Sequence, residues 1–99
     1  MPLLFSYGTL RHADVQRKTF AREIRSEPDT LSGYARGTAG PHANAVFTGD
    51  AADHVEGAAL EVTDAELAAA DAFERQFDYR RIEVTLDSRR AAWVYVWDG

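Results

Sequence analysis

One carboxylate of the sequence occupies a position where a helix would direct it toward the interior of the protein. Four apolar residues recur at the spacing of one helical face: Leu67, Ala70, Phe73 and Phe77. Glu74 falls within the same stripe. Because burial disfavours the ionised form of a carboxyl group, it raises the pKa and prepares the group for proton transfer near neutral pH. Glu74 is therefore the first candidate for acid–base chemistry.

A structural role would explain the position of Glu74 at least as well. Buried glutamates are usually paired with a cation, and Arg80, Arg81 and Arg89 follow a short distance along the sequence. Spacing alone favours such an ion pair over a functional site, because ion-pair networks also perturb pKa values. Both interpretations stay open at this point.

Other residue types with catalytic or metal-binding potential lack the neighbours that their chemistry needs. His12, His42 and His54 are scattered without the spacing of metal ligands, so we expect no metal site. Ser6 lies outside the Gly-x-Ser-x-Gly pattern of a serine nucleophile. The chain contains no cysteine, which excludes disulfides, thiolate zinc sites and a cysteine nucleophile.

Size and charge limit the partners that we expect for the chain. Its 99 residues, 45% of them hydrophobic and 27% charged, predict a single domain over residues 1–99. The net charge is −5 and basic residues are interleaved with acids, so nucleic acid and anionic membranes are not expected partners, whereas a small polar ligand is compatible. The N-terminal apolar run is too short for a signal peptide or a membrane span, and a cytoplasmic location is the default expectation.

The first part of the chain predicts a strand, a turn and a short helix. The apolar run Leu3–Tyr7 is typical of a buried strand, and Gly8 predicts a tight turn at its end. Asp14 is the expected N-cap of a helix over Val15–Phe20. These elements would place the turn after the first strand near the start of a helix.

A hairpin is expected next, with strands at Ala21–Ser26 and Leu31–Thr38. Pro28 and Asp29 provide the turn chemistry between them. Residues 37–53 are rich in glycine, alanine and histidine, and they predict a loop around one short strand. Loops of this kind often form the walls of binding pockets.

The second half of the chain predicts a strand, a helix and a terminal hairpin. Alternating apolar residues indicate a half-buried strand over Val55–Val62. Thr63 and Glu66 have the spacing of a capping box, which places a helix over Asp64–Gln76. Alternation on both sides of a turn at Asp87–Arg89 predicts the hairpin. Together these elements predict an α+β domain with a small, curled, mixed or antiparallel sheet and two short helices.

Three aromatic residues, Trp93, Tyr95 and Trp97, alternate along the last predicted strand, Ala91–Trp97. Such a row covers a core or a dimer interface more often than it stacks on a sugar or a base. A homodimer and an interaction surface at this strand both stay open.

Three motifs follow one another along the chain. Leu4–Arg11 contains Tyr-Gly-Thr-Leu, Val55–Val62 begins with Val-Glu-Gly and leads into the helix that carries Glu74, and Tyr79–Val84 reads Tyr-Arg-Arg-Ile-Glu-Val. In this order they resemble the γ-glutamylcyclotransferase-like family over almost the whole chain. The resemblance implies the fold of that family, a small curled sheet or barrel with two short helices.

The resemblance also implies a role for each motif. The catalytic acid of the family matches Glu74. Backbone N–H groups of the loop after the first strand would hold the substrate in a cavity between this loop and the helix. The implied substrate-binding residues are Tyr7, Gly8, Thr9, Leu10, Arg11 and Tyr79. His42 and Asn44 are further candidates for substrate selection.

The implied reaction is the cyclisation of a small γ-glutamyl amine or γ-glutamyl amino acid to 5-oxoproline with release of the amine, an intramolecular transferase or lyase reaction. Glu74 would act as general base and then as general acid, and the cyclisation needs no metal or cofactor. Two other functions stay open, because a fold does not fix a function. One is a non-catalytic module that binds a small carboxylate or amino acid, and the other is an interaction domain that uses the aromatic row.

Overall fold

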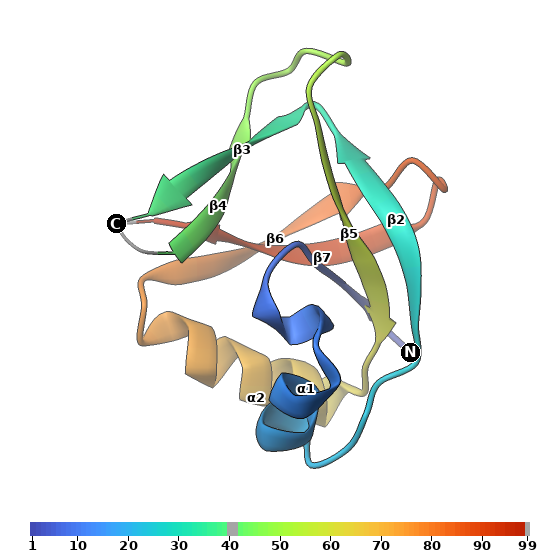
Figure 1. Ribbon diagram of the computed structural model, residues 1–99, viewed down its shortest axis with the longest axis vertical. Coiled ribbons are helices and arrows are strands. Elements are labelled where there is room, and N and C mark those ends of the chain that lie inside the picture. Colours follow the sequence, from blue (N-terminus) through green and yellow to red (C-terminus); the bar gives the residue numbers. More distant parts are fainter. Residues whose placement is uncertain (40–41, 99) are drawn as a thin grey trace.

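The computed structural model contains one five-stranded sheet, one two-stranded sheet and two helices (Figure 1). It describes residues 1–39 and 42–98, with the side chains of residues 38, 39, 42 and 43 outside that description. The strands are β1 Leu3–Ser6, β2 Ser26–Ser32, β3 Tyr34–Ala39, β4 His42–Phe47, β5 His54–Glu61, β6 Tyr79–Thr85 and β7 Ala91–Trp97. The two α-helices are α1 Ala13–Phe20 and α2 Asp64–Arg75, and a short 3-10 turn, η1 Thr9–Arg11, precedes α1. Among the described residues, no helix is long and apolar enough to span a membrane.

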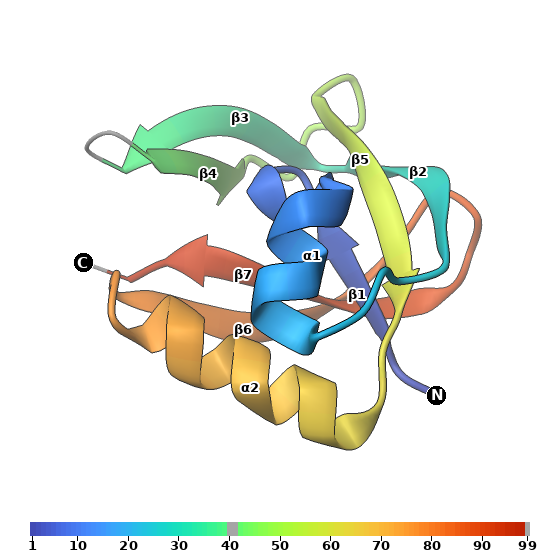
Figure 2. The same ribbon diagram turned by 60° about the horizontal axis from the view of Figure 1, so that its bottom comes forward.

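The large sheet is mixed and has the strand order β2-β5-β1-β7-β6. Its middle strand, β1, is antiparallel to β5 and parallel to β7. Because side chains alternate along a strand, Leu4 packs in the cluster with the helices and Phe5 packs in the cluster on the opposite face. Both helices lie against one face of the sheet (Figure 2). The mixed α+β architecture expected from the sequence is confirmed.

Strands β1 and β5 approach each other so closely that one position between them accepts only glycine. A Cβ atom at Gly57 would lie 2.3 Å from the carbonyl oxygen of Ser6 and 2.8 Å from the ring of Phe5. Any larger residue would have to push the two strands apart. This contact fixes the end of β1, where the candidate site begins.

The helix α2 and the terminal hairpin agree with the sequence analysis. The hydroxyl of Thr63 accepts a hydrogen bond from the N–H of Glu66, whose carboxylate accepts one from the N–H of Thr63. This capping box starts the helix at Asp64, as predicted, and the helix ends at Arg75. Strands β6 and β7 pair as an antiparallel hairpin.

The hairpin predicted between Ala21 and Thr38 is wrong. Strand β2 runs straight through Pro28 and pairs with β5 alone, at the edge of the sheet. An edge strand tolerates proline because half of its N–H groups face away from the sheet. Asp29 makes no turn either, since its carboxylate accepts hydrogen bonds from the hydroxyl of Ser88 at 2.6 Å and from Arg90 at 3.2 Å.

The loop predicted for residues 37–53 is wrong in part, because β3 and β4 pair there as a separate hairpin. Gly33, with a φ of 86°, lets the chain leave the large sheet between β2 and β3. The ring of Phe47 packs edge-on against Tyr34 with 5.3 Å between centroids. Small side chains in this segment hid the alternation that would have predicted two strands.

Helix α1 begins earlier than predicted, with His12 rather than Asp14 at the N-cap. Its buried Gln16 forms hydrogen bonds to the segments before and after the helix. The side-chain amide donates to the carbonyl oxygen of Leu10 at 2.9 Å, and its oxygen accepts from the N–H of Ile24 at 2.8 Å. The bond to Leu10 holds η1 in place, and with it the loop after β1.

Candidate functional site

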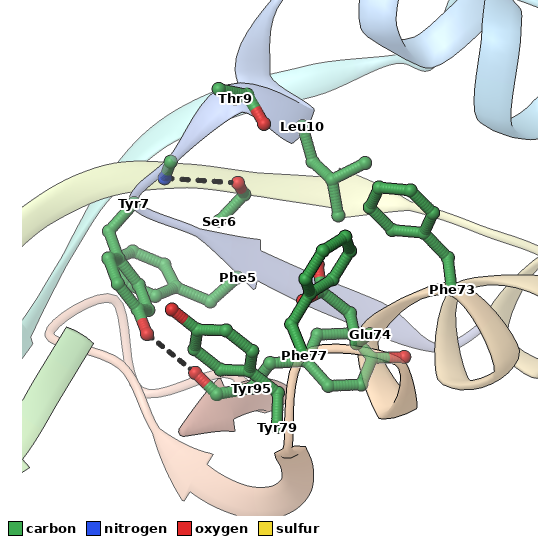
Figure 3. Close-up of a pocket in the computed structure, with 11 residues that line it drawn as sticks. Phe5, Ser6, Tyr7, Thr9, Leu10, Phe73, Glu74, Phe77, Tyr79 and Tyr95 are labelled. Atoms are coloured by element: carbon green, nitrogen blue, oxygen red, sulfur yellow. Dashed lines mark hydrogen bonds between the residues drawn. The ribbon is translucent and has the colours of Figure 1, made fainter. Parts of the chain in front are cut away.

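A cavity of about 350 Å³ lies between the loop after β1 and the last turn of α2 (Figure 3). Its walls are mainly aromatic and aliphatic, and Glu74 is the single charged side chain among the described residues that line it. The lining residues are Phe5, Ser6, Tyr7, Gly8, Thr9, Leu10, Phe73, Glu74, Phe77, Tyr79 and Tyr95. The first and third sequence motifs thus meet the helix that carries Glu74.

Glu74 extends from α2 into this cavity and is half-buried (Figure 3). Among the described residues, no cation forms an ion pair with its carboxylate and no donor forms a hydrogen bond with it. Arg80 pairs with Asp98 at 3.1 Å and Arg81 pairs with Asp71 at 3.2 Å, so the ion pair considered from the sequence is not formed. Burial raises the pKa of Glu74 from its ordinary value of 4.5 to about 7.

The apolar stripe of α2 is buried at its N-terminal end and open at its C-terminal end. Leu67 and Ala70 are buried in the core, as expected. Phe73 and Phe77 instead remain 40% and 38% exposed, and their rings touch edge-on with 5.5 Å between centroids. The expectation that the whole stripe packs into the core is therefore wrong, and its uncovered end forms the mouth of the cavity.

A chain of polar contacts braces the wall opposite the loop. The hydroxyl of Tyr7 donates to the carbonyl oxygen of Tyr95 at 2.6 Å, and the hydroxyl of Tyr95 donates to Asp71 at 2.7 Å. Asp71 is paired with Arg81, whose guanidinium lies 4.4 Å from the centre of the Trp93 ring. Burial raises the pKa of both tyrosines, so their hydroxyls stay protonated as donors.

Tyr79 lines the cavity from β6, where the sequence analysis expected it. Figure 3 shows its ring beside that of Tyr7. Burial and the neighbouring charge of Glu74 raise the pKa of Tyr79. Tyr79 is thus a protonated hydroxyl group in the same cavity as the carboxyl of Glu74.

The loop after β1 lines the cavity with Tyr7, Gly8, Thr9 and Leu10. The N–H groups of Thr9 and Leu10 have no acceptor in the described part of the chain, as is normal at the start of a helical turn. Arg11 behaves differently from the expectation, because its N–H and its Nε both donate to the carbonyl oxygen of Gly8, at 3.3 and 3.1 Å. Arg11 does not line the cavity. Gly8 has a φ of −126°, which any residue adopts.

Sequence reasoning missed several of the lining residues. Besides Arg11, it proposed Asn44, which has another role, and His42, whose side chain is not described. Phe73 precedes Glu74 in α2, and Phe77 lies in the turn just after the helix. Their spacing from Glu74 was a signal that they would share its surroundings. The carboxamide of Asn44 accepts a hydrogen bond from the N–H of Trp97 at 2.9 Å, and Asn44 does not line the cavity. The side chain of His42 lies outside the described residues. The lining residues not foreseen are Phe5, Ser6, Phe73, Phe77 and Tyr95.

No metal site is formed by the described residues. Within residues 1–39 and 42–98, no three histidine, cysteine, aspartate or glutamate side chains lie close enough together to hold an ion. The polar side chains of the described residues that line the cavity are the carboxyl of Glu74 and the hydroxyls of Ser6, Thr9 and three tyrosines.

The family of the chain follows from comparison with known proteins. Residues 4–99 match the family described as "Gamma-glutamyl cyclotransferase, AIG2-like", and the chain belongs to this family. No match was found among curated proteins.

Solved structures share the fold. The solution structure of At5g39720.1 from Arabidopsis thaliana has a TM-score of 0.82 and 25% identity over 97% of this chain and 68% of its own. That of At3g28950.1, also from Arabidopsis thaliana, has a TM-score of 0.76 and 27% identity over 97% of this chain, which spans 61% of its length. The crystal structure of the uncharacterised protein PH0828 from Pyrococcus horikoshii, at 19% identity and a TM-score of 0.76 over 100% of this chain and 80% of its own, shows the fold alone.

Proposed function

We propose that this family member cyclises a γ-glutamyl amide to 5-oxoproline and releases the attached amine. The observation that carries the proposal is the state of Glu74, whose carboxyl faces the cavity without a cation and has a pKa raised to about 7. A group with such a pKa is present in both protonation states near neutral pH, which suits a catalyst that accepts a proton and then returns it.

The loop and the aromatic wall support binding of the glutamyl head group. The N–H groups of Thr9 and Leu10 point to a role in holding the α-carboxylate or the γ-carbonyl oxygen, since successive free amides bind anions without a formal charge. The hydroxyl of Tyr79 is a further donor in the same cavity. Tyr7 is held by its bond to Tyr95 and would act as a wall of fixed shape.

The reaction closes a five-membered lactam within the substrate. The neutral α-amine attacks the γ-carbonyl carbon, and Glu74 takes a proton from the amine nitrogen as the new C–N bond forms. The tetrahedral intermediate then expels the original amide nitrogen, which receives this proton from Glu74 as its bond to the γ-carbon breaks. The products are 5-oxoproline and a free amine, and no water or redox partner is consumed. Proton transfer of this kind contributes about 10²- to 10⁴-fold, and the folded geometry of the substrate supplies much of the remainder.

The test is the formation of 5-oxoproline from a panel of γ-glutamyl amines and γ-glutamyl amino acids. The wild type should form 5-oxoproline, and Glu74→Gln should be slower by about 10²- to 10⁴-fold because the amide cannot accept the proton. Undiminished turnover by the variant would refute the mechanism. Binding of these compounds without any turnover by the wild type would instead identify a non-catalytic binding module. A homodimer and a cytoplasmic location stay predictions from the sequence.

A further inference from the structure

The cavity offers no cation for a second carboxylate of the substrate. Glu74 is the single charged side chain among its described lining residues. Two arginines lie close by, but both are directed at the backbone. The Nε atom of Arg11 donates to the carbonyl oxygen of Gly8 at 3.1 Å, and Arg36 donates from Nη2 to the carbonyl oxygen of Tyr7 at 3.1 Å. A leaving group with its own carboxylate would therefore meet the charge of Glu74 and no compensating charge.

Three further arginines lie behind the aromatic wall of the cavity. Arg75, Arg80 and Arg81 line a separate polar cleft of about 440 Å³, which shares with the cavity the residues Tyr79 and Tyr95. In that cleft Arg80 is paired with Asp98, and Arg81 is paired with Asp71. These cations are thus separated from the cavity by two tyrosines.

The surroundings of Glu74 determine what the leaving nitrogen can carry. In the proposed reaction this nitrogen must come within reach of the Glu74 carboxyl to receive its proton. Its substituent therefore begins beside Phe73 and Phe77, which flank Glu74 and expose 40% and 38% of their surface at the mouth. Figure 3 shows the side chain of Leu10 facing the same two rings. Covering such apolar surface is favourable by about 25 cal/mol per Å².

We infer that the leaving amine is a hydrocarbon amine without a carboxylate, such as an arylalkyl or alkyl amine, and that Phe73 and Phe77 select it. This inference rests on the proposed function and names the substrate class of that same site. A γ-glutamyl arylalkylamide places its carboxylate and amine at the loop end of the cavity and its ring against the two phenylalanines. An amino acid as leaving group places an unpaired carboxylate there instead.

The test compares γ-glutamyl-benzylamide with γ-glutamyl-alanine as substrates. The wild type should show a kcat/KM at least about tenfold higher for the benzylamide, because burial of part of the ring contributes on this scale. Phe77→Ala should lower the ratio of kcat/KM for the benzylamide to kcat/KM for γ-glutamyl-alanine by about tenfold, because both substrates share the reacting groups and only the benzylamide loses the apolar contact.

The matched control is Phe47→Ala, which removes another exposed phenylalanine, 69% exposed on β4 and outside the cavity. It should change neither kcat/KM value. Should Phe77→Ala fold poorly, Phe73→Ala tests the same rim, and both variants are checked by their circular dichroism spectra.

The outcomes separate this inference from the proposed function. Faster turnover of γ-glutamyl-alanine than of the benzylamide by the wild type would overturn the inference and leave the proposed function standing. If no compound is turned over, the proposed function fails, and NMR titration of the wild type with both compounds decides the inference. Preferential binding of the benzylamide that Phe77→Ala abolishes would then uphold the apolar subsite, and equal or absent binding would refute it.

Discussion

Glu66 and Glu74 stand on the same face of one helix, yet their surroundings move their pKa values in opposite directions. Glu66, in the first turn of α2, accepts two hydrogen bonds from Arg22, at 2.6 and 2.8 Å, and one from the N–H of Thr63. The Arg22 guanidinium, together with the capping bonds, lowers the pKa of Glu66 to about 2. Glu74, in the last turn, has no such partner, and burial raises its pKa to about 7.

Position on a helical face therefore does not decide the role of a carboxylate. The helix dipole adds to the difference between the two pKa values. The N-terminus of the helix favours the negative charge of Glu66, and the C-terminus disfavours that of Glu74. The charge of Glu66 stabilises the fold. Glu74 remains available to exchange a proton with a ligand in the cavity.

The largest difference between the two glutamates is expected in activity. Glu74→Gln should lower kcat for 5-oxoproline formation by about 10²- to 10⁴-fold, because the proton acceptor is lost. Glu66→Gln, measured in parallel, should leave kcat within about twofold because its partners lie outside the cavity. Equal losses of kcat in the two variants would contradict the assignment of proton transfer to Glu74 alone.

A second difference is expected in stability above neutral pH. The folded-state pKa of Glu74 is raised from 4.5 to about 7, so its stabilising contribution is complete below pH 4.5 and is lost as the pH rises through about 7. At pH 8 the ionised, half-buried carboxylate destabilises the fold. Glu74→Gln should then increase the free energy of unfolding by about 1–3 kcal/mol in urea titrations. The gain should shrink at pH 4, and a gain of the same size at both pH values would argue against a raised pKa.

The opposite pH dependence is expected for Glu66. Its pKa is lowered from 4.5 to about 2, so its contribution to stability is present above pH 4.5 and is lost as the pH falls through about 2. Glu66→Gln should therefore lower the free energy of unfolding by about 1–2 kcal/mol at pH 7, where it weakens the cap and the pairing with Arg22. The wild type and the variant should converge toward pH 2. The matched control at pH 7 is Thr63→Ala, which removes the other half of the capping box. It should lower the free energy of unfolding by about 1 kcal/mol.

The smallest effect is expected from removing Arg81, the cation that is paired with Asp71. This carboxylate lies one turn before Glu74 and is paired with Arg81. Arg81→Leu leaves Asp71 bonded to Tyr95 but without a cation. The uncompensated negative charge of Asp71 should then raise the pKa of Glu74 further. The low-pH limb of the kcat profile should move to higher pH by roughly half a unit. Arg80→Leu, which removes an arginine paired with the exposed Asp98, should leave the profile unchanged.

The parts of the fold that sequence analysis predicted depend on neighbours in the chain. Thr63 and Glu66 specify the start of α2 by a local exchange of hydrogen bonds. The alternation of apolar residues specifies the terminal hairpin in the same way. The position of Glu74 on the inner stripe was predictable for this reason. Its place beside the loop after β1 was implied only by the resemblance of the three motifs to a known family.

The parts that were not predicted depend on contacts between distant segments. Pro28 lies within a strand because β5 leaves it at the sheet edge, and the partner of Asp29 is Ser88, in another turn. Arg22 contacts Glu66 from an irregular segment for which the sequence predicts a strand. The exposure of Phe73 was not predicted either. Periodicity indicates which residues share a helical face, but it does not indicate where the sheet that covers this face ends.

The most direct test of the account is an NMR titration of the glutamate side-chain carboxyl carbons, with Glu74→Gln and Glu66→Gln used to assign the two signals. Glu74 should titrate with a midpoint near pH 7, and Glu66 should titrate with a midpoint near pH 2 in the same protein. A midpoint near 4.5 for Glu74 would show an ordinary, solvated carboxylate and would contradict its role as the proton-transfer group.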